Sequence, residues 1–480
     1  MKSTDTHHTA DQGRHKPGAS VRWALTALSL SALLPALGTS IANVSLPTLA
    51  STFHASLAHV QWIVLAYLLS ITTLIVSIGR LGDLIGRRRL LLVGIAMFTL
   101  ASVLCGAAST LWLLLAARAI QGVGAAIMLS LGMAFVGETV SKDRTGSAMG
   151  LLGTVSALGT ALGPSIGGML IAGIGWRAIF LINLPLGGMA FILALRCLPP
   201  DPPRAKAGAL RFDYAGTLIL AMTLGAYALA VTVGGGRFGP RNLVLAAAAL
   251  AGVWLFVLAE RRVAFPLLQL ALFRNHVLSA SLIMSALVSA VMMATLVVGP
   301  FYLALALGFD TAGIGLILSI GPIAAALTGI PAGRIADRLG TRAITCIGLS
   351  GIAAGSLALA LAPLKWGVAA YIVPILIMTI SYALFQTANN TAVMANVPPD
   401  QRGLISGMLN LARNLGLITG ASVMGAVFTL GAGDIAHAQA QAVAAGMRLT
   451  FAIATALMVV ALAAAWASHA HARRVVHFTL

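Results

Sequence analysis

Acidic residues are scarce in this 480-residue chain. It contains 12 Asp and Glu, and charged residues of both signs make up 9% of it, whereas a soluble domain carries about 25%. So few charged side chains cannot cover the surface of the soluble domains that a chain of this length would otherwise suggest. The composition therefore excludes a set of soluble domains.

Cysteine is also sparse. Cys105, Cys197 and Cys346 lie inside apolar runs at no metal-ligand spacing, and an odd, scattered set argues against a disulfide framework. We expect all three to be packing residues, and we expect neither a metal site nor a cofactor.

Apolar residues and basic residues are abundant instead. The chain is 59% hydrophobic, its mean hydropathy is +0.96, and 30 Lys and Arg give it a net charge of +18. In a soluble protein such a charge would indicate nucleic acid. With this apolar content it indicates anchoring at a membrane surface, and no nucleic-acid partner is expected.

The apolar sequence divides into blocks long enough to cross a bilayer, which takes roughly 20 mostly apolar residues. Residues 1–22 are polar and basic and predict a disordered tail. The first block is too long for a signal-peptide core and has no small-residue cleavage site, so it predicts a retained span. Fourteen spans are predicted, at 23–43, 59–79, 90–108, 111–136, 145–172, 178–198, 213–234, 242–259, 277–305, 312–333, 343–362, 366–388, 403–431 and 446–468.

The distribution of Lys and Arg predicts the orientation of these spans. The N-terminal tail and every second connection hold 22 of the 30 basic residues, and the opposite connections hold five. Because basic residues concentrate in cytoplasmic loops, both termini are expected in the cytoplasm. The remaining three, Arg118, Arg196 and Arg413, fall inside predicted spans.

A ten-residue segment occurs twice. Residues 79–88 and 333–342 are identical at five of ten positions, and each copy follows the second span of a group of six. Two parallel six-helix bundles around a central site are one transporter design. The predicted domains are a tail (1–22), a six-helix bundle (23–198), a linker region with two extra spans (199–276), a second six-helix bundle (277–468) and a cytoplasmic tail (469–480).

Several motifs resemble those of the major facilitator superfamily, and within it the fourteen-span drug/proton antiporters of the multidrug efflux type. The motifs are Gly-x-Leu-x-Asp-x-x-Gly-Arg-Arg from Gly79, Arg118-Ala-Ile-Gln121-Gly122-Val-Gly124, Gly159-x-x-x-Gly163-Pro164-x-x-Gly167-Gly168, Gln61-Trp62, Ala66-Tyr67-Leu68-Leu69, Trp176-Arg177, Leu272-Phe273-Arg274, Asn389-Asn390-Thr391 and Arg402-Gly403. The resemblance covers about residues 23–468 and implies an all-α polytopic transporter.

Two groups of residues are candidates for gating. The resemblance implies that Asp83 latches one half to the other when the cytoplasmic side is closed; the alternative is an ordinary charged turn. Glycines that recur every four residues in the fifth span share one face and allow another helix to approach closely, and the resemblance implies that this packing seals the extracytoplasmic side. The gating candidates are Gly79, Asp83, Gly86, Arg87, Asp337, Gly159, Gly163, Pro164, Gly167 and Gly168.

Arg118 is the leading candidate for proton coupling. It lies about 10 Å into the fourth predicted span. A charged group at that depth is costly unless it faces protein or water, so it is a functional candidate by default. The resemblance implies a part in proton coupling or in a polar network with Gln121. Glu138, at the end of the same span, and Arg413, in the thirteenth, are further candidates; structural pairing is the alternative for Arg413.

One position departs from the family pattern. Gly38 precedes Thr39 and the Asn43-Val44-Ser45-Leu46-Pro47 segment, where related transporters usually have an Asp. All twelve acids fall in the tail, in connections or at helix ends. Weak selection for cationic substrates is the expected consequence, because such an acid pairs with cations.

The substrate site is expected among polar, aromatic and sulfur-containing side chains of the spans that line the central site in this superfamily. Met and aromatic groups suit adaptable binding of hydrophobic molecules, although packing against lipid or protein is an equal alternative for each. The candidates are Asn43, Gln61, Tyr67, Met292, Met293, Tyr382, Phe385, Gln386, Asn389 and Asn410.

These observations predict a secondary transporter of the inner membrane and not an enzyme. It is expected to export lipophilic small molecules, antibiotics among them, by alternating access. Because the sequence has no nucleotide-binding loop, an ion gradient is the expected energy source, and export in exchange for protons is predicted. Its expected partners are substrate, protons and the lipid bilayer; we expect a monomer, with a place in an efflux assembly left open. The alternatives are a same-fold exporter of one metabolite or antibiotic, a nutrient importer and, remotely, a membrane enzyme or scaffold.

Overall fold

The computed structural model describes residues 17–139, 145–201, 213–233, 239–262, 272–273, 275–394, 402–433 and 438–478, and within these ranges the chain forms helices and no strands. In a bilayer the backbone has no water to hydrogen-bond with, so an apolar chain satisfies its own peptide groups in helices. The predicted all-α class is confirmed.

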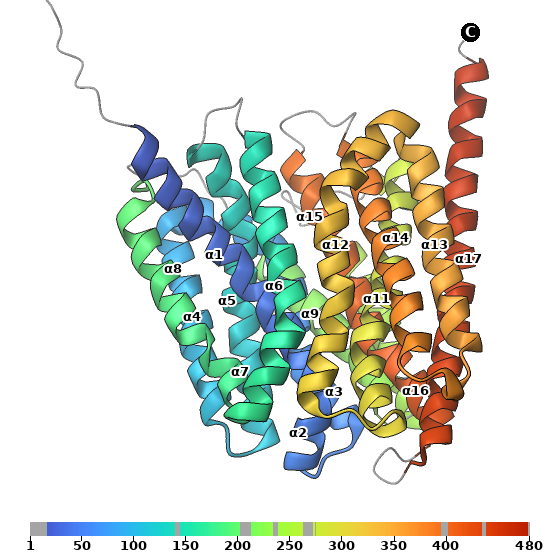
Figure 1. Ribbon diagram of the computed structural model, residues 1–480. Helices are drawn as coiled ribbons and strands as arrows, with labels where there is room; N and C mark the ends of the chain where they lie inside the picture. Colours follow the sequence, from blue (N-terminus) through green and yellow to red (C-terminus); the bar gives the residue numbers. More distant parts are fainter. Residues whose placement is uncertain are drawn as a thin grey trace, which may run out of the picture.

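The first half of the chain forms one bundle, at the left of Figure 1. Its core is built from packed apolar side chains, and α1 packs against α6 while α5 packs against both α3 and α4. The helices are α1 (Pro17–Val44), α2 (Leu46–Thr52), α3 (Leu57–Ile85), α4 (Arg87–Ala107), α5 (Leu111–Thr139), α6 (Thr145–Gly173), α7 (Ala178–Leu181) and α8 (Asn183–Cys197).

The second half forms the other bundle. Two π-helical segments adjoin its helices: Tyr302–Ala306 directly follows α11, and Gly420–Met424 joins α15 to α16. The helices are α11 (His276–Phe301), α12 (Thr311–Leu339), α13 (Thr341–Leu361), α14 (Ala369–Met394), α15 (Arg402–Thr419), α16 (Gly425–Ala432) and α17 (Ala440–Phe478). The start of α1 and the end of α17 lie at the same face of the molecule (Figure 1). We call this the terminal face and the other end the opposite face.

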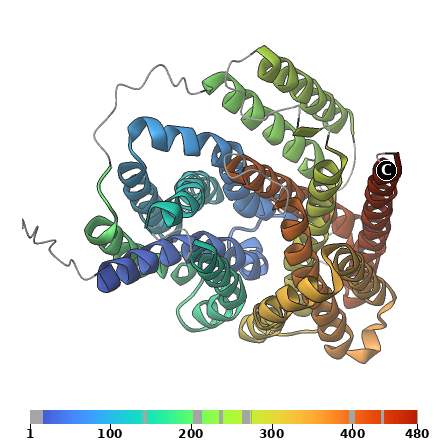
Figure 2. The same ribbon diagram turned by 90° about the horizontal axis from the view of Figure 1, so that it is seen from above.

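Two helices, α9 (Tyr214–Thr232) and α10 (Pro240–Arg262), pack against each other at the outer edge of the two bundles (Figure 2). Hydrogen bonds join α9 to both halves. The Trp62 indole on α3 donates to the Thr232 hydroxyl over 3.1 Å, and the Tyr227 hydroxyl donates to Thr419 of α15 over 3.0 Å. Helix α9 is therefore packed against both halves.

Twelve helices in the described part of the chain are long and apolar enough to cross a membrane. They match twelve of the fourteen predicted spans to within a few residues. For the fifth and tenth predicted spans the apolar helical stretches are shorter, Leu158–Gly173 and Thr311–Ala325. The fourteen-span count therefore stays a prediction.

Several element boundaries differ from the sequence prediction. Helix α1 begins at Pro17, inside the predicted tail, because proline is favoured in the first helical turn. Helix α17 runs on to Phe478, through the predicted C-terminal tail. The predicted span 178–198 is divided into α7 and α8 at Ile182.

The two copies of the repeated segment end in the same turn. Gly86 follows α3 with φ +107°, and Gly340 follows α12 with φ +82°. Glycine adopts positive φ without the steric penalty of a side chain. The repeat therefore preserves one backbone turn at the same place in both halves.

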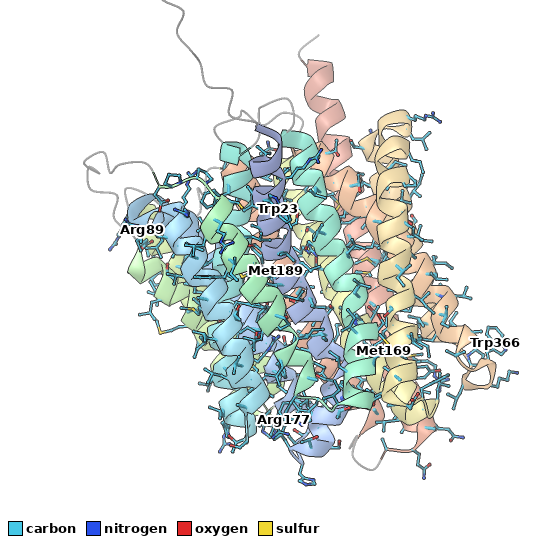
Figure 3. The ribbon with its side chains drawn as sticks, turned by 60° about the vertical axis from the view of Figure 1, so that its left-hand side comes forward. Trp23, Arg89, Met169, Arg177, Met189 and Trp366 are labelled. Carbon is cyan, nitrogen blue, oxygen red and sulfur yellow. The ribbon has the colours of Figure 1, made fainter. Side chains whose placement is uncertain are left out.

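The outer surface is apolar between two polar ends. Figure 3 shows Met189 and Met169 on outward-facing parts of α8 and α6, between Arg89 at one end of the molecule and Arg177 at the other. Met169 is 55% exposed. An exposed apolar belt flanked by charge is the surface that a bilayer covers.

Candidate functional site

A buried arginine lies at the centre of the first bundle. Arg118 on α5 is fully buried, and its guanidinium forms hydrogen bonds with α3, with α1 and with α5 itself. Its Nε donates to the carbonyl of Ile63 on α3 over 2.9 Å. Its Nη1 donates to the carbonyl of Gly38 on α1 over 3.2 Å and to Gln121 Oε1 over 2.6 Å. The structure thus brings Arg118 and Gln121 together, and it adds two backbone carbonyls that the sequence alone did not indicate.

Aromatic rings complete the surroundings of this guanidinium. The Arg118 Cζ lies 4.1 Å from the centroid of the Tyr67 ring and 5.9 Å from that of Phe180. Both distances are in the range of cation–π attraction. The Tyr67 hydroxyl donates to the carbonyl of Pro35 over 2.9 Å, which fixes the ring against α1. The Tyr67 ring is thus held between the arginine and α1.

The network continues into α4. Gln121 Nε2 donates to the Ser102 hydroxyl over 2.6 Å, and that hydroxyl donates to the carbonyl of Phe98 over 2.8 Å. Side chains and carbonyls of α1, α3, α4 and α5 thus form one hydrogen-bonded system. Such buried polar networks hold their members in a unique arrangement.

The charge balance of this network is unusual. Among the described residues, Arg118 has hydrogen bonds only to neutral groups, and its Nη2 has no hydrogen-bond partner. A buried cation without a counter-ion is costly in a medium of low polarity. The dipoles of the carbonyls and the aromatic rings offset part of that cost, and Gly38 contributes such a dipole where an acid was expected.

Three glycines of the fifth predicted span lie against α1. A Cβ at Gly159 would lie 2.8 Å from the carbonyl oxygen of Leu33, and one at Gly163 would overlap the Ser40 hydroxyl. At Gly167 it would lie 2.8 Å from Ile41 Cγ1 and from Val44 Cγ1. The stripe therefore holds two helices of the same bundle close together.

Gly168 and Pro164 lie on the other side of α6, where the two halves meet. A Cβ at Gly168 would lie 2.6 Å from the carbonyl oxygen of Thr311 and 3.0 Å from the Cα of Gly315, both on α12. A Cβ at Gly315 would overlap the carbonyl of Pro164. The backbones of α6 and α12 thus touch near the opposite face.

A second contact between the halves involves α3. A Cβ at Gly425, at the start of α16, would overlap the amide of Gln61. Gln61 lies four residues into α3 and is buried. Because α3 starts at the opposite face (Figure 1), this contact also lies near that face. Gln61 is thus an interface residue between the two halves.

An unpredicted acid organises the turn between α3 and α4. The Asp201 carboxylate accepts hydrogen bonds from the backbone N–H groups of Arg88, over 2.8 Å, and Arg89, over 3.2 Å. An anion at a helix N-terminus is favoured by the helix dipole. The sequence places Asp201 only in a connection. That connection follows the sixth predicted span, on the same face of the membrane as the α3–α4 turn, and this shared side was the signal that could have indicated the contact.

The remaining gating and coupling candidates lie outside the Arg118 network and the glycine contacts, or outside the described residues. Gly79 lies in α3 and Arg87 begins α4. The side chains of Asp83, Glu138 and Asp337 lie outside the described part of the structure. Arg413 is half-buried on α15.

The substrate candidates are not brought together around one described cavity. Asn389 is buried, donates to the Ser281 carbonyl over 3.4 Å and lines a cavity of about 70 Å³ inside the second bundle. Phe385 is buried against Gly348 of α13, and Met293 packs against Gly420. Asn43 donates to the Thr39 carbonyl within α1. The candidates Met292, Tyr382, Gln386 and Asn410 are half-buried.

Comparisons with known proteins agree with this architecture. The family model described as Major Facilitator Superfamily matches residues 28–421. The chain is 29% identical to the riboflavin transporter RibZ of Clostridioides difficile, over 84% of this chain and 87% of that protein. It is 31% identical to the multidrug resistance protein Stp of Mycobacterium tuberculosis, over 84% of this chain and 75% of that protein.

Among solved structures, the chain resembles an inward-facing, unoccupied bacterial homologue of the human lysosomal transporter Spinster. The TM-score is 0.68 at 16% identity, and the match covers 94% of this chain and 97% of the other. At this identity the likeness concerns the fold.

Proposed function

The chain belongs to the major facilitator superfamily, and from that premise we propose that this transporter exports lipophilic small molecules in exchange for protons. The observation that carries the proposal is the fully buried Arg118, held by neutral groups with Gly38 at the expected acid position. A site without an acid attracts cations weakly, so uncharged lipophilic molecules are the favoured cargo.

The contacts between the halves support alternating access. Gly168 with Gly315, and Gln61 with Gly425, hold the two bundles together near the opposite face. We propose that the terminal face lies in the cytoplasm of a cell with an inner membrane, because the tail and the connections that the sequence assigns to this side hold 22 of the 30 Lys and Arg. With this orientation, these contacts would close the outer side of the transporter.

Proton coupling is proposed through the Arg118 network. An arginine does not lose its proton in a protein, so its role is to change the proton affinity of a group that approaches it during the cycle. In this proposal Gln121 and the Tyr67 ring hold the guanidinium in place while that group comes and goes.

One experiment tests export and coupling together. Purified protein in lipid vesicles with a trapped pH-sensitive dye should move protons when a lipophilic substrate is added, and the Arg118→Ala form should not. Arg196→Ala is the matched control, because Arg196 is exposed near the end of α8 and lies outside the network. Substrate uptake without proton movement would reject the coupling, and no uptake across a broad panel would reject export of many drugs.

A second candidate function is the transport of one specific metabolite. The 29% identity to a riboflavin transporter favours it. Cells that express the protein should then show altered accumulation of a single compound, whereas multidrug export predicts lower accumulation of several unrelated lipophilic dyes. The Asp83→Asn form, altered at the expected latch, should remove either activity.

A further inference from the structure

A cavity lies between α3 and α9, away from the Arg118 network. Its volume is about 450 Å³, which is within the range of sites for drug-sized molecules. Helix α3 contributes Leu69, Ser70, Thr73 and Leu74 to the lining, and α9 contributes Thr217 and Leu218. None of these side chains is charged.

The two helices are fixed on both sides of this cavity. Toward the opposite face, Trp62 of α3 donates to Thr232 of α9. Toward the terminal face, the hydroxyls of Ser77 and Thr217 share a hydrogen bond of 2.9 Å. The two bonds are 15 residues apart on each helix, or about 22 Å. The antiparallel pair is therefore held at two points, and the cavity lies between them.

The hydroxyls of the lining present acceptors. Ser70 donates to the carbonyl of Ala66, Thr73 to that of Leu69, and Thr217 to that of Asp213. Each hydroxyl has a single proton and two lone pairs. With the proton used, a ligand in the cavity meets aliphatic surface and hydroxyl oxygens that accept hydrogen bonds.

The cavity is open to the outside of the protein. Leu218, in its lining, is 59% exposed, and α9 lies at the edge of the two bundles (Figure 2). Because the outer surface at this depth is apolar, the medium outside is the hydrocarbon of the bilayer. A molecule dissolved in the bilayer reaches the cavity without crossing water.

We infer that the cavity between α3 and α9 binds an uncharged, drug-sized lipophilic molecule that carries a hydrogen-bond donor, taken from the bilayer. The lack of charge in the lining excludes ions, and the acceptor oxygens favour a donor over a plain acyl chain. The binding is inferred from the cavity alone. The further step, that this ligand is also the cargo of the transporter, rests on the proposed function.

Filling the cavity tests the inference. Ala221 of α9 also lines it, and Gly225 lies one turn further on the same helix face, where a Cβ would meet nothing within 4 Å. Ala221→Phe and Gly225→Phe should each weaken binding of N-phenyl-1-naphthylamine, an uncharged lipophilic fluorophore with one N–H, at least tenfold in lipid nanodiscs. Gly188→Phe on α8, at a helical glycine with equally free space, should leave binding unchanged.

The hydroxyl is tested separately. Thr73→Val keeps the shape of the side chain and removes the acceptor. It should weaken binding of the N–H probe severalfold and leave the N-methyl derivative of the probe unaffected. Equal loss for the two probes, or none for either, would reject the role of the acceptor oxygens.

Two outcomes overturn the site. The first is unchanged probe affinity in both Phe variants. The second is a lipid that co-purifies with the unaltered protein, is lost in both variants and is not displaced by the probe. That lipid would assign the cavity to an acyl chain. Binding that persists without transport in vesicles would reject the proposed function and keep the site. If the two Phe variants bind the probe as the unaltered protein does and still transport, the site is rejected and the proposed function is kept.

Discussion

The Nη1 of Arg118 donates to the backbone carbonyl of Gly38 over 3.2 Å. The buried guanidinium thus meets the first helix at the residue where related transporters usually have an acid. A backbone dipole stands in for a carboxylate, and the site keeps its positive charge.

Gly38→Asp should place a carboxylate beside Arg118. A Cβ at Gly38 would lie 3.3 Å from Phe98 Cζ and 3.6 Å from the Tyr67 hydroxyl, so a small shift of one ring admits it. We expect export of a permanently cationic dye to rise roughly tenfold, the effect of about 1.4 kcal/mol. Gly38→Asn, which has the same shape without charge, is the control. Strong export of the cation by the unaltered protein would contradict the prediction.

Gly168→Val should separate α6 from α12, because a Cβ there would lie 2.6 Å from the Thr311 carbonyl oxygen. Overpacking of this kind costs about 1–3 kcal/mol, and the state that is closed at the opposite face should lose population. The measurement is the rate at which a membrane-impermeant maleimide labels a cysteine placed beside this α6–α12 contact. Labelling should speed up while transport falls. Gly173→Val, in the same helix with open space around it, should change neither.

Gly425→Val should interfere with Gln61, whose amide occupies the space of the added side chain. The loss of transport should be restored by Gln61→Ala in the same chain, because the shorter side chain vacates that space. A coupling energy of about 0.5–3 kcal/mol is typical of residues in contact. Additive effects of the two substitutions on transport rate would show that the contact does not limit the cycle.

Asp201→Ala should destabilise the turn between α3 and α4, since it removes the acceptor of the Arg88 and Arg89 backbone N–H groups. The loss of a helix cap costs about 0.5–2 kcal/mol, which should appear as a lower Tm of the purified protein. Asp201→Asn keeps one acceptor oxygen and should lose less. An unchanged Tm in the Ala variant would mean that water replaces the carboxylate without cost.

Much of the helical architecture was predictable because a bilayer demands long apolar helices. Twelve predicted spans agree with described helices, and the repeat that ends in Gly86 and Gly340 locates corresponding turns in the two halves. Boundaries were less predictable. The division of the sixth predicted span at Ile182 and the extension of α17 to Phe478 leave no mark in average hydropathy.

The candidate site was predictable in its residues and not in its contacts. Arg118 was identified because a charge at membrane depth stands out in any apolar segment. Its partners are backbone carbonyls of Ile63 and Gly38, and every residue has a carbonyl, so no sequence pattern distinguishes these two. The role of Asp201 was missed for a related reason. Its hydrogen-bond donors are backbone N–H groups more than a hundred positions away in the sequence.

The sequence by itself determined that this protein lies in a membrane, is built from two related halves and holds an arginine without an acid in the first span. Only the tertiary structure decided what surrounds that arginine, which face of α6 meets α12 and where α9 parts from α3 to leave a cavity. The physical reason is the distance along the chain between the residues that interact. Hydropathy, charge and repeats are properties of segments, whereas a contact depends on which backbone atoms and side chains the packing brings within a few ångströms of each other.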